Sequence, residues 1–414
     1  MAQRSARNNS LGARVKRLAI LLVAWALYST YIWVQQCGIG FGPVLQWMMA
    51  CSVPFSTTSD QMQRDVWLSR FAHVSDDEDE FGKDLEVTVI DVSEHETELL
   101  EAVEAQVGKD WKKKPLLLRN VWTAEQLADP SRKVTLEGMK KLNDFQVKYY
   151  NDTSLPGIDS LYPNAKGSIG DILQRIEEGA NYKVGSAEIL PKLPGSFQEI
   201  IPTRLEQLFG PHVSVGRYNS GLTKATVFVS RHPEGTRTCS KDSNNADDNG
   251  ENDAKNDIDD GADPDRASTE QPSSCDSDEE PYPHTFTGFH SEPVSNVAVQ
   301  LRGVRHWTVV DPKHSFQMLP GTAIDGRAYF QSFTDGYGYS HVPHYKIDTY
   351  PGDALFIPHW AYHRVDYYQP EEDAVSIGVA VFFLEPHYYF ANNPIFGLVS
   401  IPAMIREAAG WYVY

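Results

Sequence analysis

The chain is poor in cysteine, and the few that it has lie far apart. Its 414 residues contain four, at Cys37, Cys51, Cys239 and Cys275. No two have the C-x2-C spacing of compact zinc sites, so a zinc ribbon built from such pairs is excluded. Cys239 and Cys275 stand at the two ends of an acidic segment. They are either reduced thiols or, in an oxidising compartment, a disulfide, and the sequence leaves both alternatives open.

Basic residues are also fewer than acidic ones. The chain has 37 Lys and Arg against 56 Asp and Glu, which gives a net charge of −19. The deficit is concentrated between positions 241 and 280, where 15 acidic and 3 basic residues give −12. The remaining −7 is mild for a chain of this length and favours no particular partner. We expect no nucleic-acid partner.

Apolar residues are nearly absent from 236–283, where Asp, Asn, Ser and Gly dominate. Such a segment cannot bury enough surface to order itself, so we expect a disordered acidic insertion. A calcium loop would need Glu at its twelfth position, and the frame around Gly250 places Asn256 there. The sequence therefore predicts a solvated loop rather than an EF-hand.

Charge is missing from the 17 residues of 18–34, which are rich in Leu, Ile, Val, Trp and Tyr and follow a basic segment at 1–17. About 17 apolar residues is the lower limit for crossing a bilayer, and a basic flank favours a cytosolic N-terminus. The pattern predicts a cytosolic tail (1–17), a transmembrane signal anchor (18–34) and a membrane-proximal stem (35–85). A cleaved signal peptide of a secreted protein and a plain core helix are the alternatives.

A signal anchor of this orientation predicts a single-pass type II protein of the endoplasmic reticulum or Golgi, with the rest of the chain in the lumen. Asn151-Asp152-Thr153 is a glycosylation sequon that would then be usable. Residues 86–212 read as flanking strands and helices, with strands at 87–92 and 114–120 and helices at 94–107, 135–142, 169–178 and 198–208. Residues 213–395 read as a barrel of strands that contains the insertion. The tail at 396–414 has helical spacing, which suits either a homodimer contact or a helix that caps the core.

The most informative residues are a His-x-Glu pair and a distant His in strand-like sequence. Residues i and i+2 of a strand point to one face, so His290 and Glu292 can bind one metal from a single strand. His363, in another apolar strand, can complete the site. Two imidazoles and one carboxylate form the facial triad that suits non-haem Fe(II).

The surrounding sequence resembles the JmjC and cupin-like 2-oxoglutarate oxygenases, and among them the asparaginyl protein hydroxylases. Their pattern is approximately T-x-x-H-x-D/E-x3-N-x3-Q-x2-G-x-K-x-W followed by G-D-x-L-x-I-P-x-x-W-x-H. The resemblance covers about residues 114–386 and is weak before 213. The matching positions are Thr287, His290, Glu292, Asn296, Gln300, Gly303, Trp307, Gly352, Asp353, Leu355, Ile357, Pro358 and His363.

The resemblance implies a mainly β fold with flanking helices (α+β), built as a double-stranded β-helix or jelly roll. It implies Fe(II) as cofactor and 2-oxoglutarate as co-substrate, and it suggests a protein side chain to be hydroxylated or demethylated. Lipid, glycan and small-molecule substrates stay open as alternatives. His290, Glu292 and His363 would be the metal-binding and catalytic residues. Thr287 and Arg305 would hold the distal carboxylate of 2-oxoglutarate, and Asn296 would line the metal pocket. His359, which also follows Pro358, is the rival of His363, and the motif spacing favours His363.

Three departures from the family pattern bear on the co-substrate. Arg305 stands where the family has Lys, Trp360 is displaced so that Tyr362 precedes the second His, and Ala380 replaces a common Asn. Arg can also pair with a carboxylate, through a planar fork of different shape. Two alternative functions therefore stay open. One is a cupin-fold binding or scaffold protein, and the other is a jelly-roll metalloenzyme that does not use 2-oxoglutarate.

Overall fold

The structure is a computed structural model that describes residues 83–95, 98–151, 161–210, 213, 223–231, 286–323, 327–332, 339, 342–367 and 375–408. The predicted cytosolic tail, the predicted span at 18–34, most of the stem, the insertion at 236–283 and all four cysteines lie outside these residues. The choice between reduced thiols and a disulfide at Cys239 and Cys275 therefore falls outside the described residues.

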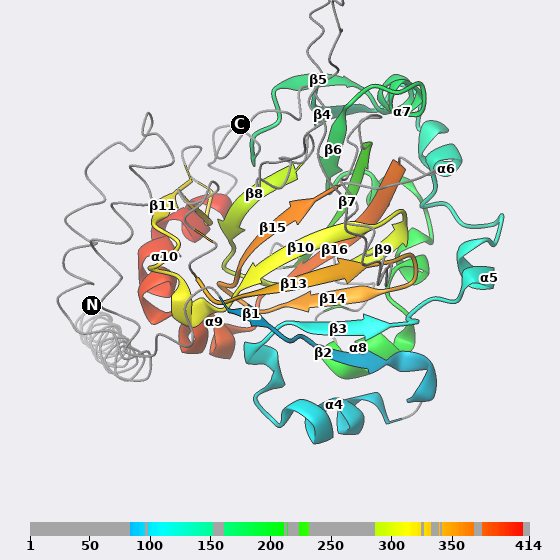
Figure 1. Cartoon of the computed structure of the whole chain (residues 1–414). Helices are drawn as coiled ribbons and strands as arrows, with labels where there is room; N and C mark the ends of the chain where they lie inside the picture. The colour runs from blue at the N-terminus through cyan, green and yellow to red at the C-terminus, as the bar shows by residue number, and fades with distance from the viewer. Residues whose placement is uncertain are drawn as a thin grey trace, which may run out of the picture.

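Two sheets form the body of the protein (Figure 1). The seven-stranded sheet has the order β1-β13-β10-β15-β8-β12-β11, and the nine-stranded sheet has the order β2-β3-β14-β9-β16-β7-β6-β4-β5. The strands of the first sheet are β1 (Asp84–Leu85), β13 (His344–Thr349), β10 (Arg305–Val310), β15 (Tyr362–Asp366), β8 (Phe286–Ser291), β12 (Phe330–Ser332) and β11 (Pro320–Thr322). Those of the second are β2 (Thr88–Asp91), β3 (Leu116–Arg119), β14 (Ala354–Ile357), β9 (Ser295–Arg302), β16 (Val375–Phe383), β7 (Thr223–Arg231), β6 (Lys183–Ser186), β4 (Gln146–Tyr150) and β5 (Ala165–Ser168).

The eight strands β7–β10 and β13–β16 contribute four to each sheet, as a jelly roll does. Apolar side chains from both sheets fill the space between them, among them Trp307 of β10, Leu355 of β14 and Val365 of β15. Strands β4, β5 and β6, which come from segment 86–212, extend the nine-stranded sheet beyond β7. The flanking segment thus adds strands to the same sheet as the barrel.

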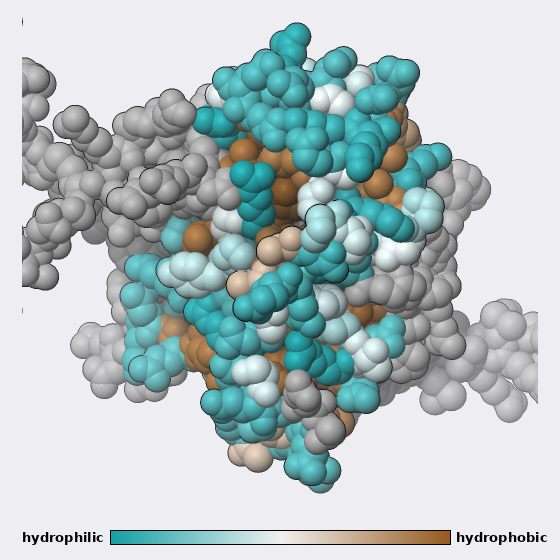
Figure 2. Space-filling model, turned by 90° about the vertical axis from the view of Figure 1, so that its right-hand side faces the viewer, coloured by the Kyte–Doolittle hydropathy of each residue, from teal (hydrophilic) through white to brown (hydrophobic). Residues whose placement is uncertain are grey.

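Short helices cover the outer faces of the sheets. They are α4 (Leu99–Val107), α5 (Ala124–Leu127), α6 (Leu136–Lys140), α7 (Ile169–Glu177), α8 (Thr203–Phe209), α9 (Pro386–Asn392) and α10 (Pro394–Ala408). Most pack on the nine-stranded sheet in one large apolar cluster, whereas α9 and α10 pack beside β12 through Tyr389 and Phe396. On the face seen in Figure 2, hydrophilic side chains cover most of the described surface, and hydrophobic residues show only between them.

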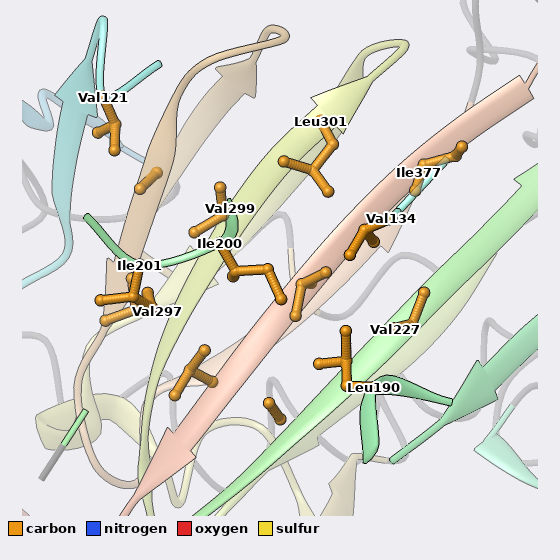
Figure 3. Packing of buried hydrophobic residues seen from close by; sticks show 14 of the residues in the cluster. Val121, Val134, Leu190, Ile200, Ile201, Val227, Val297, Val299, Leu301 and Ile377 are labelled. Atoms are coloured by element: carbon orange, nitrogen blue, oxygen red, sulfur yellow. The ribbon is translucent and has the colours of Figure 1, made fainter. Parts of the chain in front are cut away.

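Strand β9 shows how the sequence separates the two faces. Val297, Val299 and Leu301 point outward and meet Ile200 and Ile201 of the flanking segment (Figure 3). The intervening side chains therefore point into the barrel, because neighbours along a strand alternate between faces. Asn296, Ala298 and Gln300 are those inward residues.

Two glycines of the motif lie in turns with positive φ. Gly303 has φ 69° between β9 and β10, and Gly352 has φ 98° before β14, a backbone region that side chains other than glycine rarely adopt. At Gly352 an added Cβ would lie 2.3 Å from the Trp122 carbonyl oxygen, so glycine is needed for space as well. The neighbouring Asp353 forms an ion pair with Arg119 and accepts a hydrogen bond from the Tyr350 N–H at 2.8 Å. This motif aspartate therefore stabilises the turn.

The expected fold class must be corrected, because it combined the jelly roll with one transmembrane helix. Among the described residues no helix is long and apolar enough to cross a membrane. With 15 residues, α10 falls short of the approximately 20 that a span needs. The described fold is mainly β-sheet with a few helices, and its helices bury their apolar faces against the sheets instead.

Candidate metal centre

Two histidines face each other across neighbouring strands. His290 of β8 lies opposite His363 of β15, and their ring centroids are 4.3 Å apart. The His290 Nδ1 is 2.8 Å from the Gly288 carbonyl oxygen, and the His363 Nδ1 is 3.2 Å from that of Ala361. A carbonyl only accepts hydrogen bonds, so each Nδ1 carries the proton and donates. Both Nε2 atoms are therefore left with a lone pair that can bind a metal.

Glu292 completes the cluster just beyond the end of β8. The Trp360 N–H donates to the Glu292 backbone oxygen at 3.0 Å, which ties the end of β8 to the segment before β15. One ligand atom from each of Glu292, His290 and His363 lies within 4.8 Å of the others. The structure therefore brings together the three residues that the sequence selected as metal ligands.

The electrostatics of the two imidazoles suit metal binding. Burial lowers the pKa of His363 to about 4, and burial together with the nearby His363 lowers the pKa of His290 well below its usual value. Both rings are neutral near pH 7, which is the form that binds a metal. Two neutral imidazoles and a carboxylate are the donor set of a non-haem Fe(II) site, so the residues fit that metal.

A local irregularity of β8 places Thr287 on the same face as His290. A spacing of three residues would put them on opposite faces of a regular strand. Between β8 and β15, however, the pairing shifts from His290–His363 to Thr287–Val365, so three steps along β8 match two along β15. This bulge-like shift turns Thr287 inward beside Val365, and it explains the T-x-x-H spacing in structural terms.

Thr287 lies in a polar pocket with a lysine that sequence reasoning missed. Its Oγ1 accepts a hydrogen bond from the Lys183 ammonium at 3.2 Å and lies 3.2 Å from the Tyr367 hydroxyl. Lys183, on β6, is 3% exposed, and its Nζ lies 4.1 Å from the centre of the Tyr150 ring. Burial, and then the charge of Arg305, lower the pKa of Lys183 to about 7.

Arg305 points into the barrel as expected, but its guanidinium contacts the protein itself. It is 2% exposed, donates through Nε to the Ser376 hydroxyl at 3.0 Å, and donates through one terminal nitrogen to the Phe228 carbonyl oxygen at 3.1 Å. A Cβ on Gly378 would lie 2.5 Å from its other terminal nitrogen. Arg305 thus joins β10 to β16 and β7, and these contacts take up part of its hydrogen-bonding capacity.

Asn296 was expected to line the metal pocket, and that role stays a prediction. It is 3% exposed on the inward face of β9, and its Oδ1 has no hydrogen-bond partner among the described residues. A buried amide oxygen without a protein partner is costly unless a water or ligand meets it. Its position therefore suits a residue that lines a pocket.

His359 does not belong to the metal cluster. Its Nε2 accepts a hydrogen bond from the Glu385 backbone N–H at 3.1 Å, so its Nδ1 donates to the Ser295 hydroxyl at 2.5 Å. Both ring nitrogens are therefore used to connect the segment before β15 with β9 and the start of α9. The choice of His363 over His359 agrees with this geometry.

Residues 282–388 match the family model of the cupin-like domain. No curated protein matches the chain. The matched range runs from just before β8 to the beginning of α9. It includes the three residues of the metal cluster, and it also includes Thr287, Asn296 and Arg305. Lys183 lies outside it. The expected relationship is confirmed at the level of the family, and the narrower resemblance to asparaginyl hydroxylases stays a prediction. Residues 282–388 therefore form a cupin-like domain, and the match supports a relationship of this part of the chain to the JmjC and cupin-like proteins.

Proposed function

We propose that the protein is an Fe(II)- and 2-oxoglutarate-dependent oxygenase that hydroxylates a side chain of a protein substrate. The observation that carries the proposal is the pair of imidazoles with Nδ1 bonded to backbone carbonyls, next to a carboxylate. His290, Glu292 and His363 would hold the iron on one side. When bound, iron with 2-oxoglutarate and dioxygen would supply the oxidising chemistry for a C–H bond.

The polar pocket around Thr287 supports 2-oxoglutarate as the co-substrate. Lys183 and Arg305 place two cationic side chains near Thr287, which suits the distal carboxylate of a dicarboxylic acid. We assign the direct contact to Lys183 and Thr287. Arg305, held by Ser376 and Phe228, would add positive potential and fix the shape of the pocket. The lysine that the family places on the strand of Arg305 is then replaced by one from β6.

A metalloenzyme of the same fold that does not use 2-oxoglutarate is the second candidate. The contacts of Arg305 with its own barrel favour it, because they take up part of a group that the family uses for the co-substrate. The two candidates differ in one product. Only the first converts 2-oxoglutarate into succinate.

The test is iron reconstitution of the full chain without oxygen, followed by addition of oxygen and 2-oxoglutarate and measurement of succinate. We expect succinate from the unchanged protein, none from Glu292→Ala, and an unchanged rate from His387→Ala, since His387 is exposed on α9. Iron binding without succinate would favour the second candidate. Absence of iron binding would contradict both and favour a scaffold protein.

A further inference from the structure

A second group of polar and aromatic residues lies beside β12, which pairs with β8 on the edge away from β15. Strand β8 has β15 on one side and β12 on the other, and Gln331 of β12 lies opposite His290. The ring of Tyr329, just before β12, lies nearly perpendicular to that of His290, at an interplanar angle of 82° and with centroids 6.2 Å apart. This group therefore borders the metal cluster directly.

Arg327 is the charged member of the group. Its guanidinium carbon lies 4.7 Å from the centre of the Tyr329 ring and 5.6 Å from that of Tyr162. One terminal nitrogen donates to the Tyr329 hydroxyl at 3.2 Å and to the Leu161 carbonyl oxygen at 3.5 Å. Two rings and two hydrogen bonds thus hold the plane of the guanidinium in one orientation.

The second ring is itself anchored to the strand beside the metal cluster. The Tyr162 hydroxyl donates to the Gln331 side-chain oxygen at 3.3 Å, which joins the segment before β5 to β12. Arg327 and Tyr162 are partly exposed, whereas Tyr329 and Gln331 are buried. The arrangement presents a partly exposed cation, fixed over an aromatic ring that lies next to His290. Arg and Tyr of this kind are frequent anchors in protein–peptide recognition.

We propose that Arg327, held between Tyr162 and Tyr329, is a specificity-determining residue that binds the carboxylate of an acidic side chain in a peptide substrate. The inference rests on the proposed function, because it places the acidic residue beside the C–H bond to be hydroxylated. The Thr287 pocket contains its own cation, Lys183 of β6, so the two anionic groups, of co-substrate and of substrate, would each have a cationic partner. Arg is suited to the task since its planar fork matches a carboxylate.

The experiment uses the full chain loaded with Mn(II) and saturated with 2-oxoglutarate, and measures anisotropy of fluorescent peptide pools. Three pools share the same random positions and carry Asp and Glu, Asn and Gln, or Lys and Arg at the variable polar positions. We expect the acidic pool to bind about tenfold or more tightly than the amide pool, the effect of one charge-assisted contact. Arg327→Gln should remove that preference and leave 2-oxoglutarate affinity unchanged. Arg327→Glu should shift the preference to the basic pool.

Arg132→Gln is the matched control, because Arg132 also lies over an aromatic ring, that of Trp122 at 5.1 Å, but in the flanking segment. It should keep the preference for acidic peptides. Equal binding of the three pools, no binding, or an acidic preference that survives in Arg327→Glu would overturn the proposal. So would a loss of 2-oxoglutarate affinity in Arg327→Gln, which would place Arg327 in the co-substrate pocket. Peptide binding is read without turnover, so this outcome is separate from the succinate test.

Discussion

His359 and His363 differ by four positions, yet their surroundings give them different roles. His363 lies opposite His290 and keeps Nε2 toward the metal cluster, whereas His359 uses both ring nitrogens for bonds to Ser295 and Glu385. Burial lowers the pKa of both, to about 4 for His363 and about 3 for His359, so charge does not distinguish them. What distinguishes them is the partner of Nε2.

The two histidines should therefore fail in different ways when replaced. His363→Ala should lower Fe(II) affinity by more than about 100-fold, because loss of a ligand exceeds the usual effect of losing a group that orients one. His359→Ala should retain iron. It should lower the free energy of unfolding by about 1–3 kcal/mol, because the buried Glu385 N–H and the Ser295 hydroxyl each lose a hydrogen-bond partner. Metal analysis and thermal unfolding of both variants provide the check. Iron loss in His359→Ala with normal iron in His363→Ala would mean that the ligands are exchanged.

Lys183 gives the co-substrate pocket a dependence on pH. Its pKa of about 7 means that the ammonium form, which binds a carboxylate, becomes scarce as the pH rises above neutrality. Affinity for 2-oxoglutarate should fall about tenfold for each pH unit above 7, the cost of protonating the lysine before binding. Calorimetric titration of the Mn(II)-loaded protein from pH 6 to 9 measures this. Lys183→Arg should flatten the profile, because arginine stays charged. A steep profile in that variant would assign the effect to another group.

The buried Lys183 should also lower the free energy of unfolding near neutral pH. The pKa of Lys183 is about 7 in the folded protein, against 10.5 for a lysine side chain free in water, so the unfolded chain binds the extra proton between these values. Stability from this group therefore rises with pH from about 7 to 10.5 and is lowest at and below pH 7. Lys183→Met should raise the melting temperature at pH 7 and weaken 2-oxoglutarate binding. A lower melting temperature would show that the contacts with Thr287 and Tyr150 outweigh the burial of the charge.

At the scale of elements, strand patterns in the sequence agree with the structure where the period of two is regular. Residues 87–92 were expected as a strand and contain β2. The T-x-x-H spacing follows no simple period, and only the shifted pairing of β8 with β15 shows why Thr287 and His290 share a face. Lys183 gave no local signal, because its role depends on β6 pairing with β7 far along the chain. The inward direction of Arg305 was predictable, whereas its bonds to Ser376 and Phe228 were not.

The packing of β10 against β16 can be tested at Gly378. A Cβ there would lie 2.5 Å from an Arg305 nitrogen and 2.8 Å from its central carbon, and the guanidinium is held by other bonds. Gly378→Ala should lower the free energy of unfolding by about 1–3 kcal/mol, the usual cost of overpacking. The cost should shrink in an Arg305→Lys background, which removes the terminal nitrogens. Denaturant unfolding of the four proteins in this cycle gives the coupling, and additive effects would contradict the contact.

At the scale of the whole molecule, the family match covers every barrel strand except β7, and it includes the metal cluster. The match is confined to residues 282–388. Strands β4, β6 and β7 lie outside it, and they supply Tyr150, Lys183 and Phe228 to the pocket around Thr287 and Arg305. Those contributions depend on tertiary packing, which local patterns do not encode. The membrane-spanning helix that the fold prediction included is not part of the described fold, whose helices are short and cover the sheets.

The central claim is that His290, Glu292 and His363 hold iron where 2-oxoglutarate can bind it. The direct measurement is an anaerobic titration of the Fe(II)-loaded full chain with 2-oxoglutarate, followed by visible absorption. A charge-transfer band should appear and saturate at one equivalent per chain, in the unchanged protein and in His387→Ala, and should be absent in His363→Ala. An iron-loaded protein that shows no band, or a band that persists in His363→Ala, would contradict the account.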